Sequence, residues 1–560
     1  MRALAVAFGL ALGLGSPATT QTSSVLIDIL QAELNRNFQG LREKGDPPPY
    51  FISYSVTDEQ AEGVVGSMGS LQGSNRQERR VLDVSVRVGS REMDNYHTVP
   101  GERFRFTSGR ILPLEDRSAP LQRTLWQETD RVWRTAVERY VRLKSSPDWK
   151  TEQSKRPPDF TEEKPVVSVQ PVPRISPAGD EWSARVRRLS AEFVKFPGLL
   201  TGEVALTLHR EVKTIVNTEG TRLEHGRIFV RVAISARAKA QDGQDLLATD
   251  SFEATSADTL PREEVLRASV QKVASQVSEL LKAGEAEPFV GPAILSGRAA
   301  GVFFHEIFGH RVEGHRLRDD RDGQTFAKSL NTPVLPDFLS VTFDPTRHSL
   351  EGLELNGWYD FDDEAVPARS VPLVEQGILK TFLLSRDPAG PFRQSNGHGR
   401  RQPGFEPVSR QSNLFVDSTQ KVDDQQLRRL LLNEIVRQNK PYGLYFAEVT
   451  GGYTQTQRPG LQAFTVIPLV VFKIYADGRP DELVRGVDIV GTPLASFAKI
   501  LATGDHQEVF NGFCGAESGS IPVSAVAPPL LVGEIEVQKK PASNDRPPLL
   551  ARPTTFGRLP

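Results

Sequence analysis

The pattern of hydrophobic and polar positions divides the chain into a first half of mixed elements and a strand-rich second half. Hydrophobic residues at helical spacing predict helices over 25–38, 121–143, 181–196 and 262–282. Runs with strand character, two of them strictly alternating, predict strands over 51–57, 81–88, 203–216 and 226–237. This mixture predicts an N-terminal α+β domain over 19–285 with antiparallel strands.

The pattern changes after Pro288. One short helix is predicted around 298–310, a second over 423–438, and strand and turn signals fill much of the remainder up to about residue 538. We therefore predict a β-rich C-terminal domain over 286–540 that carries a short helix near its beginning. The predicted fold class of the whole chain is α+β.

Two segments lie outside both domains, and a third lies within the first domain but has no sustained periodicity. Residues 1–18 combine Arg2, an apolar run of about a dozen residues and small residues at Ser16-Pro17-Ala18, which predicts a signal peptide. The run is shorter than the roughly 20 residues needed to span a bilayer, so we expect export to the periplasm or the exterior without stable membrane insertion. Residues 145–178 are typical of a linker or surface excursion, and the Pro- and Arg-rich residues 541–560 of a disordered tail.

Composition excludes several classes of protein. The 68 basic and 70 acidic residues give a net charge of −2, which argues against a nucleic-acid partner held by bulk positive charge. A single cysteine in 560 residues excludes an intramolecular disulfide framework and a Cys-rich zinc finger. The function must therefore be inferred from motifs.

The most informative motif is His305-Glu306-x-x-x-His310, which has one residue more than the H-E-x-x-H pattern of metalloproteases. On a regular α-helix, residues five apart are separated by about 140° around the axis, against about 40° for residues four apart. The two histidines can therefore share a metal only if the helix opens into a π-type turn or ends between them. Gly309 is the residue that would permit either change.

Glu306 lies beside the first histidine, where it could take a proton from a metal-bound water and later pass it to the leaving amine. The alternative is an ordinary helix with surface histidines. The surrounding residues Phe303, Phe304, Ile307 and Phe308 argue against it, because they place the segment in a core where unpaired polar groups are costly.

A catalytic zinc commonly has three protein ligands and one open position. The residues alone leave three candidates for the third ligand, namely His315, a carboxylate such as Glu313, and Cys514. An unpaired cysteine in an exported protein also has the simpler interpretation of a buried, inert thiol.

Several motifs in the same order resemble the TldD/PmbA family of metallopeptidases, in its TldD-like branch that carries the zinc motif. They are the motif at 305–310 with Glu313-Gly314, Tyr359 with Asp362-Asp363-Glu364, and the blocks at 376–380, 396–401, 512–515 and 520–523. The resemblance covers residues 285–540 well, the region from about 180 more weakly, and 20–180 poorly. His315 and Ala365 depart from the usual aspartate and glycine, and a signal peptide is unusual in a family with many cytosolic members.

The resemblance implies a β-rich catalytic domain with a short zinc-binding helix. It implies one zinc per chain, held by His305, His310 and Cys514, with Glu306 as the catalytic glutamate. It also implies cleavage of extended or unfolded peptides inside a dimer, either a homodimer or a heterodimer with a paralogue that lacks the zinc motif.

The block at 396–401 supplies our candidates for substrate binding, His398 and Arg400. Arg400 and Arg401 could bind a substrate carboxylate or an oxyanion, although we favour the commoner role of such a pair in a solvated turn. The acidic stretch Asp319 to Asp322 lacks the carboxylate spacing of a calcium loop, and we expect a solvated loop there.

These observations together predict an exported zinc-dependent metallopeptidase that acts on extended peptides. Two alternatives stay open: a non-catalytic partner subunit of such an enzyme, and a zinc-stabilised binding protein with a closed site of four ligands. For the location, the alternative is the cytosol, as in many proteins of the family that the chain resembles.

Overall fold

The computed structural model describes residues 24–98, 107–145, 157–176, 178–318, 325–456, 463–492, 496–540, 546–548 and 550. The predicted signal peptide at 1–18, most of the predicted tail at 541–560 and the acidic stretch from Asp319 to Asp322 lie outside these residues. Among the helices that are described, none combines the length and the apolar character needed to cross a bilayer.

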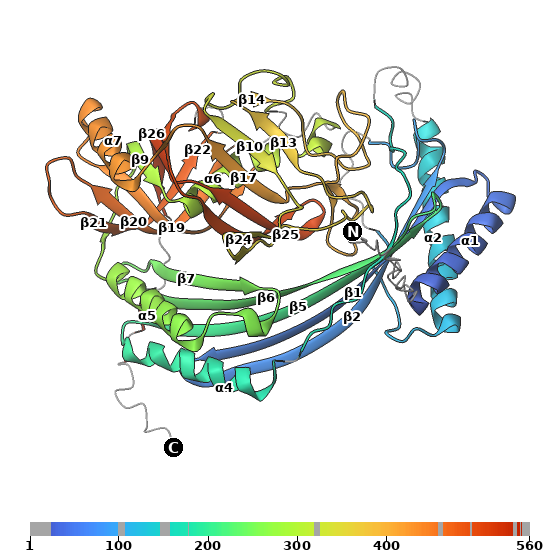
Figure 1. The fold of residues 1–560 in the computed structure, drawn as a ribbon, viewed down its shortest axis with the longest axis horizontal. Helices are drawn as coiled ribbons and strands as arrows, with labels where there is room; N and C mark the ends of the chain where they lie inside the picture. Colours follow the sequence, from blue (N-terminus) through green and yellow to red (C-terminus); the bar gives the residue numbers. More distant parts are fainter. Residues whose placement is uncertain are drawn as a thin grey trace, which may run out of the picture.

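One sheet of long, curved strands dominates the N-terminal half (Figure 1). Its strands are β1 (Pro49–Ser67), β2 (Ser70–Val88), β3 (Arg110–Ile111), β4 (Val167–Val169), β5 (Thr201–Asn217), β6 (Arg222–Lys239) and β7 (Asp245–Ala254). They follow the order β3-β2-β1-β5-β6-β4, and β7 also pairs with β6. The two-residue turn between β1 and β2 has φ of 47° at Met68 and 87° at Gly69, a left-handed geometry that suits the twist of a hairpin.

The two faces of this sheet differ in chemistry because side chains alternate along each strand. Even-numbered positions such as Tyr54, Val84, Leu206 and Val232 are apolar and buried. They pack against the helices α1 (Val25–Lys44), α2 (Ser118–Ser145), α4 (Gly179–Ser190) and α5 (Glu263–Leu280). Odd-numbered positions are largely polar, and the C-terminal half of the chain lies over this polar face (Figure 1).

The C-terminal half contains two larger sheets. The six-stranded sheet has the order β14 (Ile378–Leu379), β13 (Val371–Glu375), β10 (Leu339–Phe343), β17 (Asn413–Ser418), β25 (Gly519–Ala527) and β24 (Glu508–Ala516). The nine-stranded sheet has the order β18 (Lys421–Val422), β23 (Ile500–Gly504), β26 (Leu530–Lys539), β9 (Phe289–Leu295), β19 (Gly443–Thr454), β20 (Phe464–Ile474), β21 (Glu482–Arg485) and β8 (Gly284–Glu285), with β22 (Val487–Gly491) paired to β20 and β26.

Helix α6 (Gly297–Ile307) is buried between these two sheets and contributes to the largest hydrophobic core of the protein. Its apolar side chains contact strands of both sheets, including β19 and β25. Helix α7 (Asp424–Arg437) covers a second, smaller core built on β9 and β26. Two short hairpins complete the described part, β11 (Ser349–Leu350) with β12 (Leu353–Glu354), and β15 (Gly399–Arg400) with β16 (Val408–Ser409).

The predicted fold class is confirmed: a mixed α/β N-terminal region precedes a β-rich C-terminal region. Two expectations for the N-terminal half differ from the structure. Strands β1 and β2 extend further into their hairpin than predicted. The added residues, notably 58–60 and 70–80, are mostly polar and show no clear alternation of apolar positions. The described part of 145–178 is also not a surface excursion, since β4 joins the sheet and Asp159, Phe160 and Thr161 are buried.

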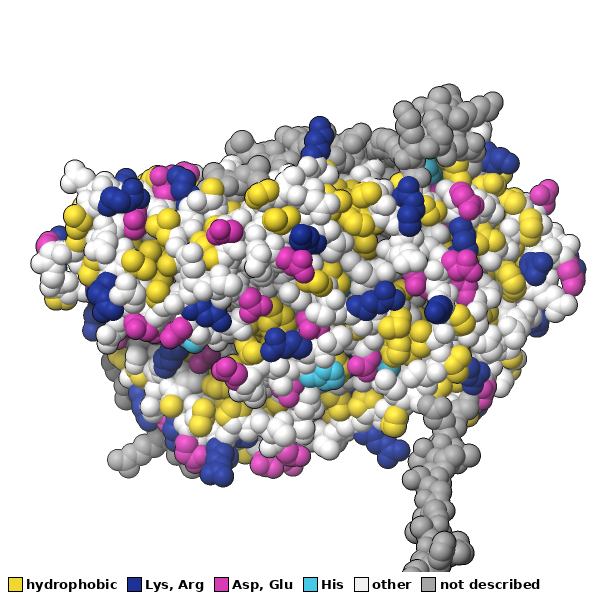
Figure 2. Space-filling view, turned by 45° about the horizontal axis from the view of Figure 1, so that its top comes forward, with side chains coloured by type: hydrophobic (Ala, Val, Ile, Leu, Met, Phe, Trp, Pro, Cys, Tyr) yellow, Lys and Arg dark blue, Asp and Glu magenta, His cyan; other side chains and the backbone are white. Residues whose placement is uncertain are grey.

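On the face drawn in Figure 2, acidic and basic side chains are interspersed, and no extended region carries a single sign of charge. This agrees with the near-zero net charge of the sequence. The domain limits at 285 and 286 and the limits of the signal peptide and tail stay predictions.

Candidate metal centre

Helix α6 places the first half of the motif. The side chain of Ser296 caps the helix by accepting a hydrogen bond from the backbone N–H of Ala299 at 3.2 Å. The α-helix ends at Ile307, and a 3₁₀ turn over Gly309–Arg311 follows. Of the two geometries that the sequence left open, the chain therefore adopts the one in which the helix ends between His305 and His310.

Gly309 is required at this turn for space. A Cβ atom built at this position would overlap the side-chain amide of Gln411, which is itself fully buried. Gln411 also donates a hydrogen bond from its Nε2 to the carbonyl oxygen of His305 at 3.3 Å. Gln411 therefore holds the end of α6 against the segment that leads into β17.

Cys514 approaches the two histidines from β24, the edge strand of the six-stranded sheet. Its Sγ lies 3.3 Å from Nε2 of His310, and one ligand atom from each of the three residues lies within 4.8 Å of the other two. The His305 and His310 rings are 5.0 Å apart and nearly perpendicular. The backbone carbonyl of Cys514 accepts a hydrogen bond from Nη2 of the buried Arg410 at 2.7 Å, which fixes the strand locally.

Electrostatics favour the ionised thiol. Burial opposes ionisation, but the neighbouring His310 and His305 hold the pKa of the Cys514 thiol well below its ordinary value. Burial likewise opposes a charge on His310, whereas Cys514 and Glu313 raise the pKa of His310 well above its ordinary value. Two imidazoles and a thiolate, 4.8 Å or less apart, are a donor set that suits zinc.

Glu306 is buried, with 5% of its surface exposed, and its Oε2 has no hydrogen-bond partner among the described residues. That oxygen lies 4.0 Å from Nε2 of His310. Burial raises the pKa of Glu306, although His305 and His310 act in the opposite direction. An unpartnered buried carboxylate beside three metal-ligand side chains is costly on its own, and a bound cation with its water would satisfy it.

Gly452 on β19 leaves the space that Glu306 occupies. A Cβ atom at Gly452 would lie 2.7 Å from Cγ of Glu306 and 2.8 Å from the carbonyl oxygen of Thr465. No sequence pattern points to this role, because Gly451-Gly452 lies in a strand far from the motif.

Glu313 is placed behind His310 and does not belong to the three-residue cluster. Its Oε2 lies 3.2 Å from Nδ1 of His310, the ring nitrogen that faces away from Cys514. Although burial opposes it, His310 lowers the pKa of Glu313 to about 2, with further help from Arg316 and Arg410. A carboxylate in this place fixes the histidine tautomer that leaves Nε2 free for a metal.

His315 lies on the far side of Glu313. Its Nδ1 is 3.0 Å from the carbonyl oxygen of Ser409, and its Nε2 is 3.7 Å from Glu517. Glu313, His315 and Glu517 also form a compact group of possible ligands. However, Arg316 pairs with both carboxylates, at 2.9 Å to Glu313 and 2.6 Å to Glu517, so the group already has its cation.

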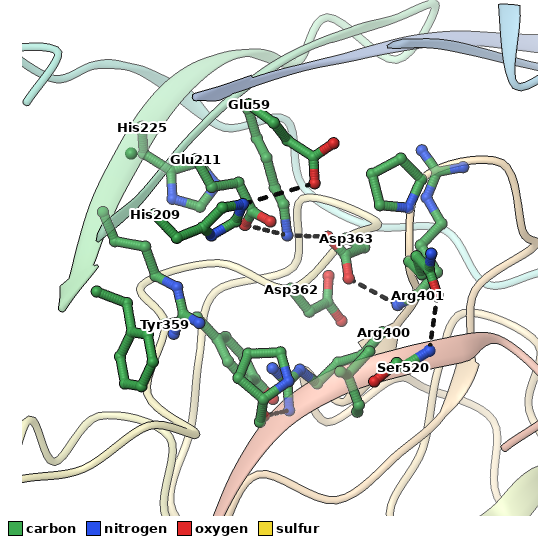
Figure 3. A pocket seen from close by; sticks show the side chains of 18 of the residues that line it. Glu59, His209, Glu211, His225, Tyr359, Asp362, Asp363, Arg400, Arg401 and Ser520 are labelled. Atoms are coloured by element: carbon green, nitrogen blue, oxygen red, sulfur yellow. Dashed lines mark hydrogen bonds and ion pairs between the residues drawn. The ribbon is translucent and has the colours of Figure 1, made fainter. Parts of the chain in front are cut away.

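The two candidates for substrate binding lie in different surroundings. His398 is fully buried between the rings of Phe343 and Tyr359, and its Nε2 lies 3.1 Å from the hydroxyl of Ser412. Burial lowers the pKa of His398 to about 3, so the ring is neutral and enclosed. Arg400 lines a cavity between the two halves of the chain (Figure 3).

The expected solvated turn at Arg400 and Arg401 is wrong, because both side chains are buried. Arg400 donates from Nη1 to two backbone carbonyls, and Arg401 pairs with Asp83 on β2 at 2.9 Å. The turn faces the N-terminal sheet instead of solvent.

Comparisons with known proteins address the same region. Residues 290–539 match the C-terminal domain of the PmbA/TldA metallopeptidases. The C-terminal half of the chain is therefore similar to the TldD/PmbA family. It is 32% identical over 239 residues to a metalloprotease of Archaeoglobus fulgidus, across 42% of this chain and 51% of that protein. It is 29% identical over 245 residues to a metalloprotease of Methanocaldococcus jannaschii, across 44% and 50% of the two chains.

The chain thus spans about half the length of these curated relatives. The fold likeness extends further. The crystal structure of TldE from Thermococcus kodakarensis superimposes with a TM-score of 0.58 and 11% identity, covering 91% of this chain and 100% of that one. The likeness of fold to that structure therefore extends over the N-terminal sheet, where the sequence resemblance is poor.

Proposed function

We propose that the protein is a zinc-dependent metallopeptidase that hydrolyses peptide bonds of extended or unfolded peptides. The observation that carries the proposal is the convergence of His305, His310 and Cys514 beside the unpartnered carboxylate of Glu306. The curated relatives are named metalloproteases, which supports the same class of reaction.

In this proposal, His305, His310 and Cys514 hold the ion. When bound, zinc supplies a Lewis acid that polarises a carbonyl group and makes water more acidic at neutral pH. Glu306 accepts the proton of the attacking water and delivers it to the leaving amine. Its burial beside the proposed ligands, with Oε2 unpartnered among the described residues, suits both roles.

The surrounding residues position these groups. Glu313 holds the imidazole of His310 through Nδ1, and Gln411 holds the end of α6 through the carbonyl of His305. Arg311 donates from Nη1 to the carbonyls of Glu306 and Ile307 and so fixes the last turn of the helix. The close packing of Glu306 against Gly452 limits the positions that its carboxylate can take.

The test is Glu306→Gln, measured for both metal content and peptide cleavage. We expect zinc near one equivalent per chain and a fall in kcat of about 10²–10⁴-fold, as for a removed general base. Glu434→Gln, which changes a carboxylate on α7, is the matched control and should leave both quantities unchanged. Full activity in Glu306→Gln would exclude the mechanism.

The same variant separates the alternatives. A zinc-stabilised binding protein needs a fourth ligand, and Glu306 is the carboxylate placed to supply it. Loss of zinc in Glu306→Gln, together with no cleavage by the wild type, would favour that function. A non-catalytic partner subunit would instead keep its zinc in Glu306→Gln and cleave nothing by itself in either form.

Substrate, assembly and location are further parts of the proposal. A reduced and alkylated protein should be cleaved while its native form is spared, because an enclosed site admits only extended chains.

We propose a homodimer, or a heterodimer with a paralogue lacking the zinc motif, to be checked by light scattering of the purified protein alone and with such a paralogue. Export should be visible as a mature N-terminus close to residue 19, whereas an intact cytosolic N-terminus would contradict it.

A further inference from the structure

A cavity of about 230 Å³ lies between the polar face of the N-terminal sheet and the C-terminal half of the chain (Figure 3). Strands β1, β2, β5 and β6 supply one wall through odd-numbered residues. The opposite wall comes from the segments 358–363 and 400–403 and from β24 and β25. In Figure 3, His209, Glu211 and His225 face Tyr359 and Arg400 across this space.

Most charged side chains that line the cavity have a direct partner of opposite charge. Arg79 pairs with Glu59. Lys213 pairs with Glu211 at 3.0 Å and with Asp363 at 2.5 Å. These pairs leave little net field of their own, because each charge is met within contact distance.

Arg227 and Arg400 differ from the others. Arg227 donates from Nη1 to the carbonyls of Asn356 and Trp358, at 3.0 and 3.1 Å. Arg400 donates from Nη1 to the carbonyls of Gln411 and Pro522, at 2.7 and 2.9 Å. Among the described residues, no carboxylate lies within 4.0 Å of either guanidinium, and no acceptor takes a hydrogen from their Nη2 or Nε atoms.

At longer range the two guanidinium groups are compensated only in part. Burial lowers the pKa of Arg227; Glu211 and Asp363 partly offset this, and the charge of Arg400 adds to it. Burial likewise lowers the pKa of Arg400, against the opposite effects of Tyr359, Asp363 and Glu211. An anion between the two guanidinium groups would offset both the cost of burying their charges and the repulsion between them.

The cavity is also lined by a buried imidazole and by aromatic side chains. His225 is only 9% exposed, and its Nε2 has no hydrogen-bond partner among the described residues. Phe229 and Phe513 meet edge to face at 6.1 Å, and Trp358 lies beside them on the lining. The cavity therefore combines two guanidinium groups and a neutral imidazole with an aromatic wall.

We propose that this cavity binds the C-terminal carboxylate of a peptide, with Arg227 and Arg400 donating to its oxygens and the aromatic wall receiving an apolar terminal side chain. The planar fork of arginine matches a carboxylate, and charge-assisted hydrogen bonds of this kind are strong in a water-poor site. The volume is below the roughly 300 Å³ at which pockets for drug-sized ligands begin, so the cavity fits the end of a chain.

Two segments of the chain contribute to both the cavity and the candidate metal centre. Phe513 lines the cavity, and the next residue, Cys514, belongs to the metal cluster. Arg400 holds the backbone carbonyl of Gln411, whose side chain holds His305. The identity of the ligand as a peptide rests on the proposed peptidase function, but the anion site itself does not.

The test is calorimetric binding to the Glu306→Gln protein, which removes turnover. The probes are N-acetyl-Ala-Ala-Phe with a free carboxylate and the same peptide as its C-terminal amide. We expect the acid to bind about tenfold more tightly or better, and Arg227→Gln to abolish that difference. Arg227→Lys, which keeps the charge but loses the fork, should recover only part of it.

Arg79→Gln is the matched control, because Arg79 lines the same cavity but is paired with Glu59 and its side chain is 44% exposed. It should leave the acid-to-amide ratio unchanged. Arg227 is preferred to Arg400 as the test position, because Arg400 is almost fully buried and its removal endangers folding. Thermal unfolding of each variant checks that the fold is kept.

Equal affinity for acid and amide would overturn the proposal. So would inorganic phosphate binding more tightly than the peptide acid, which would make this a phosphate site. Discrimination between acid and amide in a protein that cleaves nothing would keep the carboxylate site and reject the peptidase. Cleavage of peptides without discrimination between acid and amide would support the peptidase and reject the carboxylate site.

Discussion

The Sγ atom of Cys514 lies 3.3 Å from Nε2 of His310, although 204 residues separate them in the chain. His310 follows α6, which is buried between the two C-terminal sheets, whereas Cys514 lies on the edge strand β24 of one of them. The two residues meet only when α6 and β24 have taken their places in the folded C-terminal half. Metal binding at the proposed site would therefore be coupled to the folding of that half.

The first prediction concerns the thiol. Cys514→Ala should lose most of its zinc, and Cys514→His should recover part of it, since an imidazole can replace a thiolate as a ligand. In the wild type, the thiol should be nearly unreactive toward a thiol reagent while zinc is bound and should react after chelation. Metal analysis and thiol titration under native conditions measure both effects.

If the thiol reacts equally with and without chelator, or if Cys514→Ala keeps its full zinc content, Cys514 is not the third ligand. Glu306, whose Oε2 lies 4.0 Å from Nε2 of His310, would then be the leading candidate, ahead of the more distant His315 that the sequence also offers.

The second prediction concerns the carboxylate behind His310. Glu313→Gln should weaken zinc binding by about 10–100-fold, because the residue fixes the ring of a ligand through its other nitrogen. Glu517→Gln is the matched control, since Glu517 belongs to the same cluster of charges but contacts neither His305 nor His310. Competition with a zinc chelator of known affinity measures the difference. Equal affinities of the two variants would contradict the role of Glu313.

The third prediction concerns the turn between the two histidines. Gly309→Ala places a methyl group into the amide of the buried Gln411, which cannot move without breaking its bond to His305. We expect a loss of about 1–3 kcal/mol of stability, as for overpacked sites, together with weaker zinc binding. Gly515→Ala is the control, because a Cβ there would meet nothing within 4 Å. Similar unfolding midpoints for the two variants would exclude the packing argument.

The fourth prediction concerns acid stability. Burial, with a further contribution from Lys213, lowers the pKa of His225 from its ordinary 6.5 to about 4. The unfolded chain therefore binds a proton near pH 6.5 that the folded chain binds only near pH 4. The contribution of His225 to stability is complete above pH 6.5 and is lost as the pH falls from 6.5 to 4, by on the order of 3 kcal/mol.

His225→Gln should therefore lose less stability than the wild type between pH 7 and pH 4.5. His398, whose pKa burial lowers to about 3, keeps part of the acid sensitivity in both proteins. Thermal unfolding across this pH range measures the difference between the two curves. Parallel curves would show that His225 titrates normally in the folded protein.

The sequence predicts those elements whose burial is periodic. Helix α5 is bounded correctly to within two residues because Leu266, Val270, Val273 and Val277 keep one apolar face. Strand β7 was missed because its sequence, from Asp245 to Ala254, mixes polar residues on both faces. The alternation in β5 and β6 indicates that one face of these strands is polar. It does not indicate what covers that face, because the covering residues lie in a distant part of the chain.

In the candidate site, too, local sequence patterns predict some features and not others. The spacing of His305 and His310 required a break in the helix, and the structure has one. The pairing with Cys514 was implied only by family resemblance, since no local rule connects residues that far apart. Glu313 was considered as a ligand, and the structure instead puts it behind His310. Gly452 had no signal, because its importance comes from the side chain packed on it.

The distance in sequence between His310 and Cys514 also has a consequence for synthesis. A ribosome makes the two histidines and Glu306 about 200 residues before the thiol, so a growing chain passes through a long period with an incomplete ligand set. The proposed hydrolytic activity would therefore be absent until translation has passed β24. If the protein cleaves unfolded chains as proposed, this delay would protect the nascent chain, because that chain stays unfolded while its own metal site is incomplete.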